Sequence, residues 1–241
     1  MTKEMRIYQA AVDLDKVLTE NGIGYGCFGG WAINAIGCDR GTKDIDCLVG
    51  AEKDDIARVF SDQPGWHQIP GQREDYIAFL VGEKTENVLV EMFPCKPGFS
   101  KVVPMSLIKE ATTKASVGTE AIKSMMQSIA TRTVPVRGYS MRVLEIVYIF
   151  KGKVNAAANR SKVSDSNDIE YVHAHFESTL REHVHQINIQ DVGKAIKRYP
   201  SLSKVFSNLG IDVKEAVEQA GSLEITSMHP PPFLCQKAML E

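Results

Sequence analysis

Two aspartates one residue apart are the most chemically informative pair in the sequence. Asp44 and Asp46 belong to the run Asp-Ile-Asp-Cys-Leu-Val, which predicts a strand over residues 43–49. Alternate side chains of a strand share a face, so we expect both carboxylates on one face, about 6–7 Å apart at Cα. Neighbouring carboxylates repel each other and are costly to remove from water, and a divalent cation between them relieves both costs. Hard oxygen ligands at this density favour Mg²⁺.

A third acid, Glu91, lies in the otherwise uncharged run Val-Leu-Val-Glu-Met-Phe, which predicts a strand over residues 88–93. Taken alone, an acid in such a strand indicates an edge residue that faces water, because acids are almost never buried unpaired. Because Asp44 and Asp46 are also present, we instead expect Glu91 to be part of a buried charged site. The sequence therefore predicts a catalytic and metal-binding carboxylate trio of Asp44, Asp46 and Glu91.

Gly29 and Gly30 follow a predicted strand over residues 24–28 and open a predicted short helix over residues 31–36. Glycine allows the backbone to approach a ligand closely, and the amides at the start of a helix point at an anion. Alone, two glycines after a strand indicate only a tight turn. Next to the acids, which would hold the cation, the two glycines are expected to supply the backbone amides of a phosphate site.

The order of these residues resembles a known family. Gly-Gly-Trp-Ala at residues 29–32, then Arg40, Thr42 and Asp44-Ile45-Asp46, then a later strand carrying an acid, is similar to the nucleotidyltransferase superfamily of the DNA polymerase β type. The Gly-Gly-Trp-Ala variant looks most like the small-molecule branch, which includes aminoglycoside and lincosamide nucleotidyltransferases. The polymerase branch usually has Gly-Ser here, and Trp31 departs from that. Motif matches span residues 28–46, 88–93 and 134–172.

The resemblance implies an α+β fold, with a mixed β-sheet and flanking helices followed by a helical C-terminal domain. It implies metal-dependent transfer of a nucleoside monophosphate from ATP or another NTP to a hydroxyl of a small-molecule acceptor. Asp44 and Asp46 would hold one or two Mg²⁺ ions, and Glu91 would complete the second metal site or act as base toward the acceptor. Gly29 and Gly30 would cradle the phosphates through their backbone amides.

The resemblance also implies a wider set of nucleotide-binding side chains, namely Arg40, Thr42, Lys43, Lys151 and Lys153. Arg40 and Lys43 would pair with phosphate or with Asp44 itself. Lys153, together with Lys151 or Arg160, would neutralise the leaving pyrophosphate from the helical half. The alternative for Lys151 and Lys153 is an ordinary solvated helix face, which is what basic residues on a helix usually form.

The elements that must position these residues follow from periodicity and stop signals. Besides those already given, we expect a helix over 3–20 that ends at Asn21-Gly22, a helix over 54–60, and strands over 66–69 and 76–81. After residues 94–104 the pattern is mainly helical, with a short strand over 133–136 and helices over 119–130, 141–159, 165–176 and 192–209. We expect a catalytic domain over 1–105, a helical domain over 106–225 and an extended tail over 226–241.

Composition narrows the class of protein. The 241 residues include 28 Lys and Arg against 30 Asp and Glu, a net charge of −2. Nucleic-acid binding needs a basic face, so it is not expected. No apolar run reaches the roughly 18–20 residues of a membrane span, and five cysteines without CxxC spacing are typical of reduced thiols inside the cell. We expect a cytoplasmic protein whose partners are a nucleotide and a small-molecule acceptor.

Two other functions fit the same residues. An antitoxin-like enzyme that transfers AMP onto a partner protein would use the same trio, and a repurposed fold would use the cleft for another ligand. Nothing in the sequence breaks the trio, so transfer to a small molecule ranks first. Zinc is not expected, because His173 and His175, like His183 and His185, are two residues apart and do not share a helix face.

Overall fold

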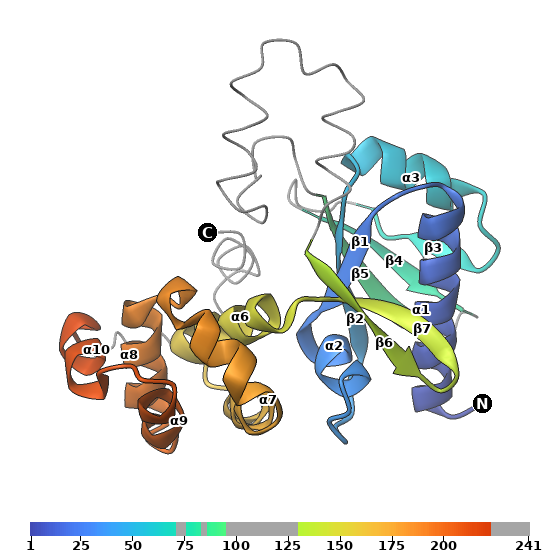
Figure 1. Cartoon of the computed structure of the whole chain (residues 1–241). Coiled ribbons are helices and arrows are strands. Elements are labelled where there is room, and N and C mark those ends of the chain that lie inside the picture. The colour runs from blue at the N-terminus through green and yellow to red at the C-terminus, as the bar shows by residue number, and fades with distance from the viewer. Residues whose placement is uncertain (71–75, 83–85, 95–129, 223–241) are drawn as a thin grey trace, which may run out of the picture. The chain divides into compact units, whose positions relative to one another are not determined.

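The chain folds into two compact units that meet in sequence after Leu144. A computed structural model describes residues 1–70, 76–82, 86–94 and 130–222. The first unit contains a seven-stranded sheet in the order β3-β4-β5-β2-β1-β7-β6, and the described part of the second is helical (Figure 1). The predicted α+β class, a mixed sheet with flanking helices followed by helices, is confirmed.

The elements have the following bounds. The first unit comprises α1 (Lys3–Glu20), β1 (Tyr25–Phe28), α2 (Gly29–Ala35), β2 (Asp44–Val49), α3 (Lys53–Ser61), β3 (Trp66–Gln68), β4 (Ile77–Val81), β5 (Val88–Pro94), β6 (Thr131–Val136) and β7 (Tyr139–Leu144). The second comprises α6 (Ile146–Asn159), α7 (Val163–Glu182), the short 3₁₀ helix η2 (Val184–Gln186), α8 (Ile189–Arg198), α9 (Leu202–Asn208) and α10 (Val213–Gln219). None of these described helices combines the length and apolar character needed to cross a membrane.

Strand β2 is central to the sheet and is paired on both sides. It runs antiparallel to β1 and parallel to β5. In this register Asp46 is the Cα partner of Phe28 on β1 and of Glu91 on β5. Partner residues project from the same face, and Asp44 lies two residues from Asp46. The register therefore places all three carboxylates on one face, which we call the carboxylate face.

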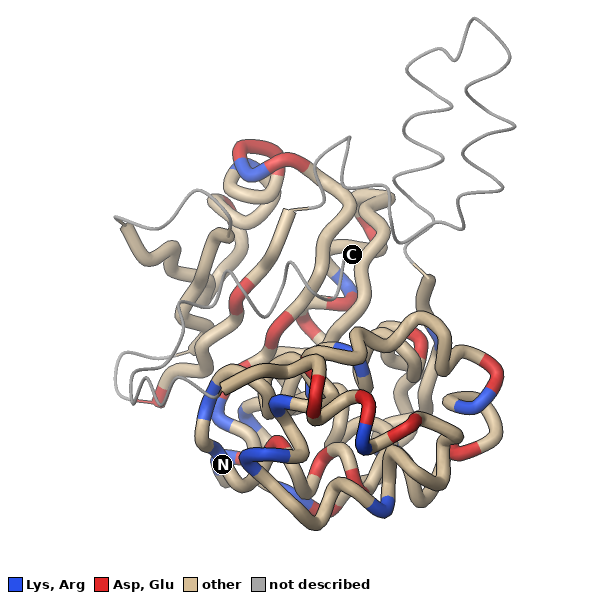
Figure 2. The backbone as a smooth tube through the Cα atoms, turned by 90° about the vertical axis from the view of Figure 1, so that its left-hand side faces the viewer, with Lys and Arg blue, Asp and Glu red and all other residues tan. Residues whose placement is uncertain are grey.

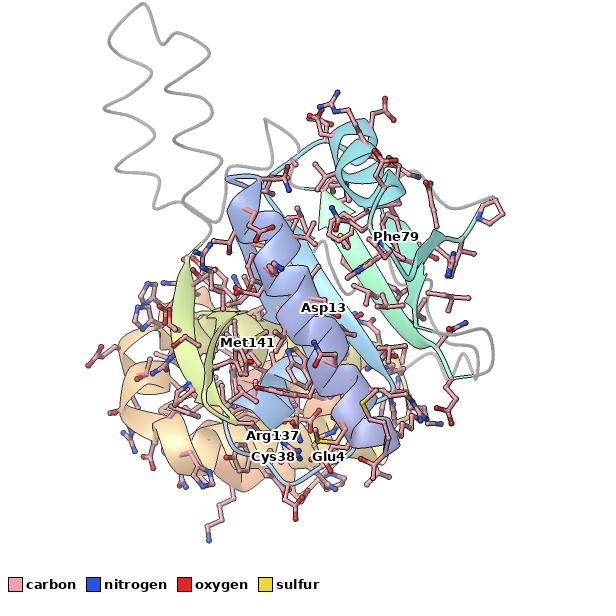
Figure 3. The ribbon with its side chains drawn as sticks, turned by 90° about the vertical axis from the view of Figure 1, so that its right-hand side faces the viewer. Glu4, Asp13, Cys38, Phe79, Arg137 and Met141 are labelled. Atoms are coloured by element: carbon pink, nitrogen blue, oxygen red, sulfur yellow. The ribbon has the colours of Figure 1, made fainter. Side chains whose placement is uncertain are left out.

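The opposite face of the sheet is buried beneath helices. Ile45, Cys47 and Val49, which alternate with the aspartates, have no exposed surface. Figure 3 shows α1 lying across this face, and the Tyr25 hydroxyl donates a hydrogen bond to Asp15 of α1. Burial, followed by the neighbouring Cys27 and by Asp15, raises the pKa of Tyr25. This helix-covered face supplies the apolar core that holds β2 in place.

Helix α3 covers the β3–β4 end of the same buried face. The Phe60 ring of α3 packs against Trp66 and Phe79, with ring centroids 4.5 and 5.2 Å away. All three side chains are buried. Rings of this size bury large apolar areas and prefer such tilted contacts, so this end of the sheet is anchored away from the carboxylate face.

The prediction of one helix over 141–159 is wrong in its first turn. Residues 139–144 form β7, which pairs antiparallel with β6 through a two-residue turn, and α6 begins only at Ile146. Both turn residues, Arg137 and Gly138, have positive φ (48° and 88°), as hairpin turns matched to the strand twist require. β7 then pairs in parallel with β1. The hairpin is part of the sheet, so the first compact unit extends well beyond residue 105, where a domain boundary was expected.

The single helix predicted over 192–209 is also wrong, because the structure has two helices, α8 and α9. Tyr199 separates them with φ −132° and ψ 85°. Proline disfavours helical backbone in the residue before it, and Pro200 follows Tyr199. The predicted helix over 119–130 lies, except for its last residue, outside the described residues, and the predicted tail over 226–241 lies entirely outside them.

A buried ion cluster joins α6 to α7 in the second unit. The Lys153 amine lies 2.7 Å from Asp168 Oδ2 and 3.5 Å from Asp165 Oδ1. Arg160 donates two hydrogen bonds to Asp165, of 2.7 and 2.9 Å. Both aspartates are almost fully buried. Buried carboxylates are tolerable only when charges and hydrogen bonds compensate them, so this cluster fixes how the two helices pack.

The cluster predicts how stability responds to acid. Burial alone would raise the pKa of Asp165, but the Arg160 hydrogen bond and the charges of Lys153, Arg160 and Lys162 lower it overall. Its folded pKa therefore lies below the unfolded value of about 3.9. The stabilisation is present above that value and is lost as pH falls through it toward the folded pKa. We expect Asp165→Asn to lower the free energy of unfolding by about 3–5 kcal/mol at pH 7.

Urea unfolding between pH 7 and pH 2.5 checks this prediction. The gap in stability between wild type and Asp165→Asn should narrow below about pH 4, the unfolded value of an aspartate. Glu182→Gln, which removes an exposed acid from the same helix, is the matched control and should follow wild type. A gap that stays constant over the whole range would contradict the assigned role of Asp165.

Candidate functional site

The carboxylate face carries the three predicted acids at the middle of the sheet. Asp44 and Asp46 lie on β2 and Glu91 on β5, and each is half-buried. The residues between them on the same strands, such as Ile45 and Val90, are fully buried. This alternation is what a strand with one covered face produces. The three acids are therefore held by strands whose apolar side chains leave little freedom to move.

Gly29 lies directly against Asp46. Its backbone has φ +66°, a left-handed conformation that side chains other than glycine rarely adopt. A Cβ at this position would overlap Asp46 Oδ2 and would lie 3.0 Å from Asp46 Cγ. The missing side chain thus lets the Asp46 carboxylate lie directly against the first backbone residue of α2. A ligand bound to Asp46 would therefore lie near the start of this helix.

Gly30 makes a second close approach, toward the segment of residues 40–42 that precedes β2. A Cβ at Gly30 would lie 2.8 Å from Thr42 Oγ1 and 3.2 Å from Arg40 Nη2. The Thr42 hydroxyl in turn lies 3.2 Å from both the backbone oxygen and Oδ1 of Asp44, to which it can donate. The structure therefore brings together most of the predicted residues of the first unit: Gly29, Gly30, Arg40, Thr42, Asp44, Asp46 and Glu91.

An aromatic row, not foreseen from the sequence, borders the acids on the same face. The Phe93 ring lies 5.4 Å, centroid to centroid, from both Phe28 and Tyr76. Phe28 and Phe93 are buried and Tyr76 is half-buried. The signal was available, because Phe93 follows Glu91 by two residues and shares its face. Phe28, which pairs with Asp46, could be placed only once the strand register was known.

The remaining predicted residues are three lysines, two of which belong to the second compact unit. Lys43 is exposed, next to Asp44 in the chain. Lys151 and Lys153 belong to the second unit. Burial lowers the pKa of the half-buried Lys151, whose amine lies 5.7 Å from the Tyr148 ring centroid. Lys153 is held in the buried ion cluster, so it does not lie on the solvated helix face that was the alternative to a phosphate role.

The acids do not form a preformed metal cage. In the part of the chain that the structure describes, no three His, Cys, Asp or Glu side chains are grouped so that they could hold a metal ion. Their chemistry nevertheless suits a hard cation, since all three offer carboxylate oxygens. Mg²⁺ typically uses only one or two protein carboxylates and completes its shell with waters and substrate phosphates. The chemistry of these residues is therefore compatible with a Mg²⁺ ion that takes most of its ligands from water or from another molecule.

Charge along the chain is mixed. Figure 2 shows acidic and basic residues interspersed along the described backbone, without a long run of one sign. Long single-sign runs are typical of tails that interact with polyanions or polycations. The local charge of the site is therefore set by the carboxylate trio and Arg40, not by a general excess of either sign.

Comparison with known proteins bears on the fold. No protein-family model matches the chain, and no curated protein matches its sequence. Among solved structures, an antigenic nucleotidyltransferase-like protein from Paracoccidioides brasiliensis superposes with a TM-score of 0.53 at 14% identity, covering 84% of this chain and 93% of its own.

Two further structures superpose less well on this chain, and the fold assignment does not depend on them. A candidate nucleotidyltransferase from H. pylori has a TM-score of 0.43 at 14% identity, with 95% of both chains covered. A candidate nucleotidyltransferase from Thermotoga maritima has a TM-score of 0.34 at 14% identity, with 76% of this chain and 93% of its own covered. At such identity the first comparison shows the fold alone. This chain therefore has a nucleotidyltransferase-like fold.

Proposed function

We propose that the protein transfers a nucleoside monophosphate from an NTP, with ATP the first candidate, to a hydroxyl group of a small-molecule acceptor. The observation that carries the proposal is the contact between Gly29 and Asp46. Gly29 has a left-handed backbone, and the Asp46 carboxylate lies against it. Glu91 is the partner of Asp46 on the neighbouring strand. The start of a helix directly beside carboxylates suited to a cation is what a metal–triphosphate needs. The nucleotidyltransferase-like fold supports it.

Asp44 and Asp46 are the proposed Mg²⁺ ligands, with Glu91 as a third ligand or as the base. When bound, Mg²⁺ would neutralise phosphate charge and orient the triphosphate. The Thr42 hydroxyl holds Asp44 in place through Oδ1. Phosphoryl-type transfer depends mainly on such positioning and charge compensation. The strands beneath the acids would provide the positioning, and the bound cation together with Arg40 the charge compensation.

In the proposed reaction the acceptor oxygen forms a bond to the α-phosphorus, and the bond from that phosphorus to the bridging oxygen of pyrophosphate breaks. Glu91 accepts the proton of the acceptor hydroxyl. To act as this general base, its carboxylate must lie within hydrogen-bond distance of that hydroxyl. Gly29 and Gly30 receive the phosphates along their backbone, and Arg40 compensates phosphate charge. The products are the nucleotidylated acceptor, pyrophosphate and a proton.

The cations of the helical unit have a lesser part in this proposal. Lys153 already balances Asp165 and Asp168, so its charge is committed within its own unit. Lys151 is half-buried with a lowered pKa and stays a predicted phosphate contact. Lys43, exposed beside Asp44, stays one as well. The core of the proposal needs only residues of the first unit.

The function is tested with the full chain, Mg²⁺ and each of the four common NTPs. We expect one NTP to raise the unfolding temperature only when Mg²⁺ is present, because a ligand at a hundredfold its Kd stabilises by about 2.7 kcal/mol. Asp46→Asn should abolish this stabilisation and any pyrophosphate release with a panel of hydroxyl acceptors. Asp54→Asn, an exposed acid on α3, is the control and should behave as wild type.

Three outcomes decide the proposal. Metal-dependent binding that Asp46→Asn removes would support it. Absence of binding for every NTP with Mg²⁺ would refute it and favour a repurposed fold. Transfer of α-labelled phosphate onto a protein in cell extract, with none onto small molecules, would replace the small-molecule acceptor by a protein.

Gly29→Ala provides an independent test of the glycine contact. Left-handed backbone costs a non-glycine residue about 1–2 kcal/mol, and the new Cβ would also displace the Asp46 carboxylate. Gly22→Ala carries nearly the same backbone strain, since Gly22 has φ +65° with nothing within 4 Å of the added Cβ. We expect both variants to lose stability and only Gly29→Ala to lose Mg–NTP binding, as measured by titration calorimetry. Equal binding by the two variants would rule out the contact as part of the site.

A further inference from the structure

Asn34 lies at the point where α2 gives way to the segment that carries Arg40 and Thr42. The helix ends with Gly37 at φ +107°, and two backbone bonds close the end, from Gly37 to Asn34 and from Cys38 to Ile33. This pair of bonds is the Schellman arrangement, which stops a helix at a left-handed glycine. The direction of the chain after α2 is thus set by the end of the helix.

The half-buried side chain of Asn34 makes two further hydrogen bonds just beyond the end of α2. Its amide nitrogen donates to the backbone oxygen of Cys38 at 3.3 Å and to that of Arg40 at 3.0 Å. Both acceptors are carbonyl oxygens, so only the NH₂ end of the amide can face them. The orientation of the amide follows from its partners. One side chain therefore ties the backbone of residues 38–40 to the last turn of α2.

The tied segment is connected to the acids through short contacts. Arg40 and Thr42 are the two side chains that a Cβ at Gly30 would meet first. The Thr42 hydroxyl lies within hydrogen-bond distance of Asp44. A shift of the 38–42 backbone would therefore move the guanidinium of Arg40 and the hydrogen bond to Asp44 together. The two hydrogen bonds of the Asn34 side chain go to backbone oxygens and not to the carboxylates.

We propose that Asn34 is a positioning residue, which holds residues 38–42 so that Arg40 meets phosphate and Thr42 orients Asp44. The inference rests on the proposed function and adds a residue to which that function assigns no role. The amide suits this task because it offers two donors to two carbonyl oxygens. An aspartate of the same shape offers none when ionised and repels both oxygens.

Hydrogen–deuterium exchange of the free protein tests the geometric part without any ligand. Asn34→Ala and Asn34→Asp should raise exchange of the amides at residues 38–42. The matched control is Asn21→Ala, because the Asn21 amide nitrogen likewise donates to a backbone oxygen, that of Val17, at the end of a helix of the same unit. It should leave residues 38–42 unchanged. Unchanged exchange in both Asn34 variants would overturn the proposal.

The functional part uses titration of Mg²⁺ with the NTP that binds wild type best. Loss of two hydrogen bonds that position a site should weaken binding about tenfold in both Asn34 variants, at a temperature where each is folded. Lowering the pH restores one donor to Asn34→Asp, since a protonated carboxyl has an O–H. The affinity ratio of Asn34→Asp to Asn34→Ala should therefore rise as pH falls, which a merely structural residue would not produce.

The outcomes separate the two proposals. If wild type binds no NTP with Mg²⁺, the proposed function fails and Asn34 loses its role in it. If wild type and Asn21→Ala bind but the Asn34 variants bind equally well, the proposed function stands and the inference about Asn34 falls. Weakened binding in the Asn34 variants alone, with faster exchange at residues 38–42, supports both.

Discussion

The register of β2 against its two neighbours determines what the carboxylate face can do. Asp46 pairs with Phe28 on one side and with Glu91 on the other, and Gly29 follows Phe28 at the end of β1. Because side chains alternate with a period of two, a slip of one residue would turn Asp44 and Asp46 into the core and Ile45 out of it. The fully buried residues beneath α1 and α3 oppose that slip. The hydrophobic core thus specifies the position of the acids without touching any ligand.

The helical unit handles buried charge in a different way. On the sheet, the acids lie half-buried on one face, where the proposed cation and phosphates would reach them. Between α6 and α7, Asp165 and Asp168 are buried and already compensated by Lys153 and Arg160. An ion cluster of this kind contributes little net stability relative to an apolar core, but the loss of one member is costly. The same residue types therefore serve packing in one unit and are available for chemistry in the other.

Local patterns predicted much of the fold and most of the grouped site residues. The spacing of Asp44 and Asp46 was sufficient to place them on one face, and the helix expected over residues 31–36 ends within one residue of the observed end of α2 at Ala35. Longer-range features were not accessible. Residues 141–144 satisfy a helical pattern as well as a strand pattern, and only pairing with β6 and β1 decides between them. Lys153 looks like a surface cation until its two acidic partners, which lie one helix further along the chain, are placed beside it.

The parallel pairing of β7 with β1 has a consequence for the order of folding. Strands β1, β2 and β5 all lie within the first 94 residues, so the acids can be assembled early during synthesis. Until residues 139–144 emerge, however, β1 remains an edge strand of the sheet, directly before Gly29. An exposed edge strand can pair with strands of other chains and so promotes aggregation. Pairing it with a segment that is distant in sequence is slow. The acids can therefore come together while the β1 edge of the sheet still lacks its partner strand.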